Sequence, residues 1–208
     1  MADEISNKTL AILVVAAIVV TLGGTMLVIR QGPSVTLTGL YTTQQGTAAF
    51  NVSEVVSIKI NQNSINFGEG YVNESDTFCT MDSTGAHTTA CDGSWNNPSN
   101  AGFIIENNGN VDCQVAINAS TASEFVGGTA TTPQYNFKSS DKTGETGSCT
   151  SGLVSSWTAF SHTGQTICSN LKYQEANDEI RVDVQVTVPN DATPGQHTDT
   201  VTFTASST

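Results

Sequence analysis

Basic residues are scarce in this chain, which has 7 Lys and Arg against 19 Asp and Glu and a net charge of −12 at pH 7. Nucleic acids are bound through basic surface patches, and the sequence contains none. We therefore expect no nucleic-acid partner. An acidic surface suits contact with solvent, cations or an extracellular matrix, and it also fits a role in solubility alone.

Motifs for catalysis and cofactor binding are missing. The sequence has no G-x-S-x-G, P-loop, dinucleotide fingerprint or H-E-x-x-H motif. The three histidines, His87, His162 and His197, stand in unrelated local sequences, so they do not define a catalytic group. We expect no enzyme, no catalytic residue and no cofactor.

Metal-binding motifs are missing as well. Asp76, Asp82 and Asp92 offer carboxylates for calcium, but they lack the regular D-x-D-x-D-G spacing of a calcium loop. None of the five cysteines forms a C-x-x-C pair, so the spacing of a zinc ribbon is absent too. The sequence predicts no metal site.

The cysteines instead indicate disulfides formed in an oxidising compartment. We expect local pairs, Cys79 with Cys91 and Cys149 with Cys168, because each pair flanks a turn-rich loop. Cys113 is then left over, on a strand face with apolar neighbours, where a free thiol packs as a small hydrophobe. Two disulfides can be drawn among five cysteines in about fifteen ways, and a bond between Cys113 and Cys149 is the main alternative.

Charged residues are absent from residues 9–29, where apolar side chains occur on every side of an expected helix. A helix over residues 10–29 is about 30 Å long, the thickness of a bilayer's hydrocarbon core. Because it has no polar stripe, it must lie in lipid or inside a protein assembly. We expect residues 1–30 to form this hydrophobic helix, in a membrane or in the core of a filament.

A cleaved signal peptide is the alternative to a retained helix. Signal peptides have a positive start and a shorter apolar run. Here residues 1–8 carry two acids and one lysine, and the apolar run continues past the only candidate cleavage region, residues 21–25. The sequence therefore favours retention.

Small residues mark one side of the expected helix. Ala17, Thr21 and Thr25 recur every four positions, with Gly24 beside them. Such rows let two helix backbones approach closely, so we expect self-association through this face. The alternative is that small residues are simply common in membrane helices.

The rest of the chain is typical of a mainly β protein, since Ser, Thr and Asn make up about a third of the sequence. The clearest strand is 180–188, where apolar and polar residues alternate as in a half-buried strand. Further strands are expected over 48–60, 64–67, 102–106, 112–118, 135–138 and 197–205. The segment 107–110, Asn-Asn-Gly-Asn, predicts a hairpin turn between two of them.

These strands predict an antiparallel β-sandwich over residues 48–208, the head of the protein. Two stretches without periodicity, 70–100 and 139–170, are expected as disulfide-stapled loop insertions. Residues 31–47 are expected to be a linker, or a strand exchanged into the sheet of a neighbouring molecule.

Four Asn-x-Ser/Thr sequons begin at Asn7, Asn51, Asn73 and Asn118. Asn7 is not usable if it lies on the cytoplasmic side. Asn51, Asn73 and Asn118 are candidate N-glycosylation sites of an exported glycoprotein, although several sequons arise by chance in so Asn-rich a chain.

The opening 7–15, the turn 106–112 and the closing segment 188–195 look like those of archaeal surface proteins, and the whole layout resembles archaeal pilins and archaellins. The resemblance implies an immunoglobulin-like head and helices that bundle into a filament core coated by the heads. Archaeal prepilins carry a basic and a small residue before a cleavage point, and residues 3–7 offer no such site. The chain is then already processed, a non-standard pilin or a membrane-anchored protein.

We therefore expect a structural subunit of an extracellular, pilus-like filament with an adhesive capacity. Its main partner is itself, as a homopolymer through the N-terminal helix, with the membrane as its surroundings before assembly. The alternative is a cell-surface domain, held by a single-pass membrane anchor, that binds a surface glycan or a partner cell. Both place the protein at the cell surface, membrane-anchored or in a filament.

Overall fold

The computed structural model describes residues 7–31, 46–95, 101–129 and 132–208, and within the N-terminal helix it describes the side chains of residues 9 and 11–22. The chain divides into two compact units, Met1–Asn51 and Val52–Thr208. The second unit corresponds to the head expected over residues 48–208, and the name is used for Val52–Thr208 from here on. The expected exchanged strand over residues 31–47 falls almost wholly outside the described residues.

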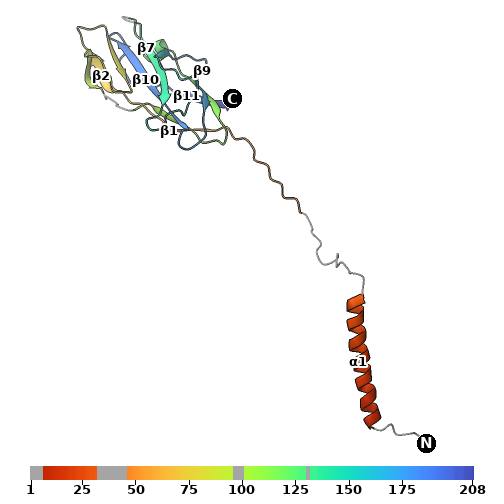
Figure 1. The fold of residues 1–208 in the computed structure, drawn as a ribbon. Helices are drawn as coiled ribbons and strands as arrows, with labels where there is room; N and C mark the ends of the chain where they lie inside the picture. Colours follow the sequence, from red (N-terminus) through yellow and green to blue (C-terminus); the bar gives the residue numbers. More distant parts are fainter. Residues whose placement is uncertain (1–6, 32–45, 96–100, 130–131) are drawn as a thin grey trace. The chain divides into compact units, whose positions relative to one another are not determined.

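The first unit contains a single long helix among its described residues, α1 (Asn7–Gln31), at the red end of the colour scale in Figure 1. The helix contains no proline along its whole length, and its first turn contains no acidic residue. The expected helix over residues 10–29 is therefore confirmed, and it extends beyond both predicted ends.

The head contains antiparallel strands arranged in sheets of six, three and two strands (Figure 1). The six-stranded sheet has the order β1 (Ile58–Gln62), β5 (Phe103–Asn107), β10 (Glu179–Pro189), β7 (Gln134–Asp141), β8 (Thr158–Ala159), with β3 (Phe78–Asp82) also paired to β10. The three-stranded sheet has the order β11 (Thr202–Ser207), β6 (Cys113–Asn118), β9 (Gln165–Leu171). The third sheet pairs β2 (Gly68–Val72) with β4 (Cys91–Trp95), and one short helix, α2 (Ala122–Phe125), precedes β7.

One hydrophobic core is shared by the two larger sheets. The six-stranded sheet contributes fully buried residues such as Ile105 and Phe137, and the three-stranded sheet contributes Val115, Ile117 and Leu171. The side chains alternate along β6, where every second residue from Cys113 onward is buried. The predicted mainly β, antiparallel architecture is therefore confirmed.

Strand β10 lies at the centre of its sheet. One edge pairs with β7 along most of its length, and the other pairs first with β5 and then with β3. Polar residues of β10 are buried along with its valines: Asp183 accepts a hydrogen bond from Ser83 at 2.8 Å, and Thr187 bonds to Thr80 at 2.9 Å. The prediction of a strand here is confirmed, but the prediction that it is half-buried is wrong, because its polar face is covered too.

The predicted hairpin at residues 107–110 is wrong. Strands β5 and β6 on either side of this turn belong to different sheets and do not pair with each other. The side chain of Asn107 is buried and donates to the carbonyl oxygens of Val111 and Leu171, while its own oxygen accepts from the Gly109 amide. These bonds turn the chain from one sheet to the other.

Several other strand predictions need correction. Only the last residues of the expected strand 48–60 are extended in a sheet, as β1, and residues 64–67 belong to no strand. A Cβ on Gly109 would lie 2.2 Å from the Val55 carbonyl, so this part of residues 48–60 packs against a turn instead of a strand. The expected insertions contain β2, β3 and β4 in 70–100 and β8 and most of β9 in 139–170. The expected strand 197–205 begins later, as β11.

Candidate functional site

The surface of α1 is the most apolar exposed region among the described residues. Eight of its large apolar side chains are between 50% and 72% exposed: Ile12, Leu13, Val14, Val15, Ile18, Val19, Val20 and Leu22. Four of them are consecutive, and successive residues of a helix point about 100° apart, so the exposed apolar surface surrounds the axis. Contiguous apolar surface of this extent marks a site of contact with protein or lipid.

The small-residue row is described only in part. Thr21 donates its hydroxyl to the Ala17 carbonyl, 2.7 Å away, and lies 3.0 Å from the Ile18 carbonyl. The hydroxyl is thus satisfied within the helix and needs no water, which suits apolar surroundings. Gly24 and Thr25 belong to α1, but their side chains lie outside the described residues.

Among the residues that the structure describes, no helix is long and apolar enough to cross a membrane.

Two disulfides staple the head. Cys79 in β3 is bonded to Cys91 at the start of β4, and Cys149 is bonded to Cys168 in β9. These are the two local pairs that the sequence predicts. Cys113 is a free, buried thiol, and burial together with the neighbouring Asp112 raises its pKa to about 11. Two disulfides indicate an oxidising, extracellular environment.

The three candidate glycosylation sites differ in accessibility. Asn51 is exposed. Asn73 donates its side-chain amide to Asp92 at 2.9 Å, and Asn118 is half-buried in β6, opposite Thr202 of β11. Asn51 is therefore the sequon most open to an enzyme, and modification of all three stays a prediction.

The three histidines have separate partners. His87 forms an isolated bridge with Met81, His162 lies 2.8 Å from the Glu124 carboxylate, and both ring nitrogens of His197 lie 2.8 Å from backbone carbonyls. Asp82 accepts hydrogen bonds from the amide and the hydroxyl of Thr84, and Asp92 accepts one from the side chain of Asn73.

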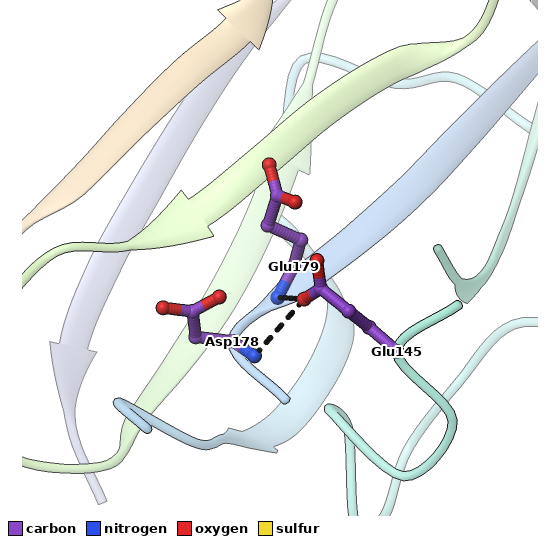
Figure 2. Close-up of side chains that lie close together, drawn as sticks. All are labelled: Glu145, Asp178 and Glu179. Atoms are coloured by element: carbon purple, nitrogen blue, oxygen red, sulfur yellow. Dashed lines mark hydrogen bonds between the residues drawn. The ribbon is translucent and has the colours of Figure 1, made fainter. Parts of the chain in front are cut away.

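A different acidic group comes together on the head, and the sequence reasoning missed it. Glu145, Asp178 and Glu179 place carboxylate oxygens within 4.8 Å of one another (Figure 2). Glu145 comes from the loop after β7, Asp178 immediately precedes β10, and Glu179 is the first residue of β10. One oxygen of Glu145 accepts from the backbone amides of Asp178 and Glu179 at 3.3 and 2.9 Å, as drawn in Figure 2.

Lys142 completes the surroundings of this acidic cluster. Its ammonium lies 3.1 Å from Glu145 and forms a second ion pair with Glu179. The hydrogen bond to Glu179 raises the pKa of Lys142, so this lysine stays charged. No sequence pattern marks the cluster, because Glu145 lies 33 residues before Asp178 and meets it only when the loop after β7 folds against the start of β10.

Comparison of the chain with family models, curated proteins and solved structures gives no match.

Proposed function

We propose that this protein is a structural subunit of an extracellular filament, in which copies of α1 bundle in the core and the β-rich heads form the surface. The observation that carries the proposal is the apolar surface that surrounds α1 on every side. Such a helix needs to be covered along its whole circumference, and a bundle of identical helices provides that cover. Burial of this surface contributes about 25 cal/mol per Å² of apolar area.

The head has features that suit exposure outside the cell. The two disulfides cross-link segments of the head. The chain has a net charge of −12, and such a charge favours solubility. Within this proposal the head is an immunoglobulin-like sandwich, as in the archaeal pilins and archaellins that the chain resembles. Two sheets that share one core support that finer assignment.

Close approach of neighbouring helices would occur at Ala17 and Thr21. A methyl side chain at position 17 keeps this side of the helix narrow, and the Thr21 hydroxyl is already bonded to the Ala17 carbonyl. Neither residue then presents an unsatisfied polar group to a neighbouring helix. The apolar side chains on the remaining faces fill the space between more distant helices.

The test is a pair of substitutions that both add apolar volume to α1. Ala17→Leu places a bulky side chain on the narrow face and should abolish filaments, or reduce them strongly. Val20→Leu adds one methylene at a side chain that is already large, and should leave filaments unchanged. Filaments are scored by electron microscopy of cells, and the size of the purified full chain in detergent is measured by sedimentation. Normal filaments with Ala17→Leu would argue against helix packing through this face.

The same experiment separates the proposal from a membrane-anchored binding domain. A single anchored subunit predicts monomers in detergent for both the wild type and the variants. Native material that contains only monomers would contradict the filament proposal.

A further inference from the structure

Two of the three histidines meet at the short helix α2. Both ring nitrogens of His197 lie 2.8 Å from a backbone carbonyl oxygen, Nδ1 from that of Phe125 and Nε2 from that of Thr193. His162, in the segment before β9, places its Nε2 2.8 Å from a carboxylate oxygen of Glu124 in the same helix. Both histidines therefore connect α2 to segments that come much later in the chain.

The two groups that contact the ring nitrogens of His197 are both hydrogen-bond acceptors. A neutral imidazole carries one N–H, so it donates to only one of the two carbonyl oxygens, and its other nitrogen then faces an oxygen lone pair at 2.8 Å. An imidazolium carries an N–H on each nitrogen and donates to both oxygens. The folded head therefore favours the protonated ring at this position.

The contact of His162 favours a protonated ring as well. Glu124 accepts hydrogen bonds from the backbone amide and the hydroxyl of Thr121, at 2.8 and 2.7 Å. These hydrogen bonds lower the pKa of Glu124, and the charge of His162 lowers it further, so Glu124 stays a carboxylate in mild acid. A carboxylate binds an imidazolium more strongly than it binds a neutral ring. Both histidine rings are exposed, so solvent weakens each contact.

Three further titratable groups surround α2. Asp199 accepts from the amide and the hydroxyl of Ser120 at 3.1 and 2.7 Å, and Asp191 accepts from Thr129. Burial raises the pKa of Tyr135, and the neighbouring Asp199 raises it further. Aspartate and tyrosine ordinarily titrate outside the range from about pH 5 to 8, whereas histidine titrates within it. The two histidines are therefore the groups around α2 that change charge near neutral pH.

The helix that they contact covers an aromatic part of the core. Phe125 packs on Tyr135 with ring centroids 4.5 Å apart, and Tyr135 packs on Phe160 at 4.2 Å. Val126, the residue that ends the helix, is buried. Because α2 has only 4 residues, its position depends on this packing and on the side chains that bond to it.

We propose that His162 and His197 form a pH-dependent clamp, which holds α2 on the head in mildly acidic surroundings and weakens as the pH rises above about 7. The folded head binds these protons more tightly than the unfolded chain does, so the stability that the clamp contributes falls with rising pH. Loss of the clamp increases local opening of α2, while the two large sheets keep their shared core.

The test measures backbone hydrogen exchange of the full chain in detergent at about pH 5.5 and about pH 8, with each rate corrected for the intrinsic effect of pH. The amides of Phe125 and Val126 report on α2, because both donate to carbonyls at its start. We expect their protection to fall at least about threefold between the two pH values in the wild type.

Substitutions of single histidines assign the effect. His197→Gln should remove most of the fall in protection, and His162→Gln should remove part of it, because glutamine does not titrate. The matched control is His87→Gln, which replaces the third histidine, also exposed, and should keep the whole fall. Burial and neighbouring carboxylates raise the pKa of Asp178 to about 6, so it titrates in the same range. Its effect is common to all variants and cancels in the comparison.

Three results would overturn the clamp. They are equal protection of α2 in the wild type at both pH values, an undiminished fall in His197→Gln, and loss of the fall in His87→Gln. If His197→Gln does not fold, the NMR signals of the imidazole nitrogens in the wild type decide the matter. Both nitrogens of His197 should keep their protons at a pH where the urea-unfolded chain has lost one. Loss of that proton at the same pH in both states would contradict the proposal. None of these measurements depends on filament formation.

Discussion

Polar side chains in the interior of the head act as connectors between elements that are distant in sequence. Ser83 donates to Asp183 and accepts from the Val184 amide, and Ser139 donates to the Ile167 carbonyl while accepting from the Val154 amide. Each side chain replaces a backbone partner that the local geometry cannot provide. Residues of this kind should be sensitive to substitution, even where they contribute little to the hydrophobic core.

Asn107→Ala should lower the free energy of unfolding by about 3 kcal/mol, because it leaves buried backbone groups without partners. The residue is 1% exposed, and its amide bonds to the Val111 and Leu171 carbonyls at 3.0 and 3.1 Å. Urea unfolding followed by circular dichroism measures the loss. The adjacent Asn108 is exposed, so Asn108→Ala should change the free energy by less than about 0.5 kcal/mol. Equal effects at both positions would contradict the connecting role of Asn107.

Cys113 should be unreactive in the folded protein and reactive after unfolding. Burial and the nearby Asp112 raise its pKa to about 11, and the thiolate is the species that reacts. At pH 8 we expect iodoacetamide to modify no cysteine of the native chain, and one cysteine per chain in denaturant. Mass spectrometry of tryptic peptides identifies the modified residue. Three or more modified cysteines in denaturant would show that a disulfide is absent.

At the scale of elements, an alternating sequence pattern predicts the position of a strand correctly. It does not predict the burial of a strand whose polar face is covered by other parts of the fold. β6 alternates because one face meets the core, and its boundaries are nearly those expected. β10 alternates too, yet Asp183 is buried, since Arg181 of the same strand and Ser83, which follows β3, supply its partners. The residues 107–110 correctly predict that the chain turns between two strands. They do not determine whether the next strand pairs with the preceding one or joins another sheet.

The disulfide between Cys149 and Cys168 should contribute about 3 kcal/mol to stability, because a cross-link over a separation of 19 residues removes chain entropy from the unfolded state. The double variant Cys149→Ser, Cys168→Ser should therefore unfold at a lower urea concentration by that free energy. The matched control is Cys113→Ser, which removes a thiol that forms no bond. If Cys113→Ser alone costs as much as the double variant, burial of the sulfur atoms and not the cross-link explains the effect.

At the scale of the whole molecule, the sequence predicts the division into an apolar helix and a β-rich remainder, because 21 residues without charge (9–29) stand out in any pattern. It does not predict the acidic cluster. Glu145 and Asp178 are joined by a hydrogen bond across 33 residues, and neither belongs to a recognisable motif. The charge-free segment is visible in the sequence itself, whereas the cluster depends on how the head packs. All described core residues of the head lie at Val56 or later, and their packing determines which loops come into contact.

Removal of the N-terminal helix should separate assembly from folding. The core cluster of the described residues includes nothing before Val56, and the chain divides between Asn51 and Val52. A chain of residues 52–208 should therefore unfold cooperatively, with both disulfides formed and with a Tm within about 2 °C of the full chain. It should sediment as a monomer without detergent, because the exposed apolar residues of α1 are gone. Differential scanning calorimetry and sedimentation velocity measure the two properties independently. A head that unfolds without cooperativity would show that residues before Val52 complete its sheets, and a head that still polymerises would place the assembly contacts outside the helix.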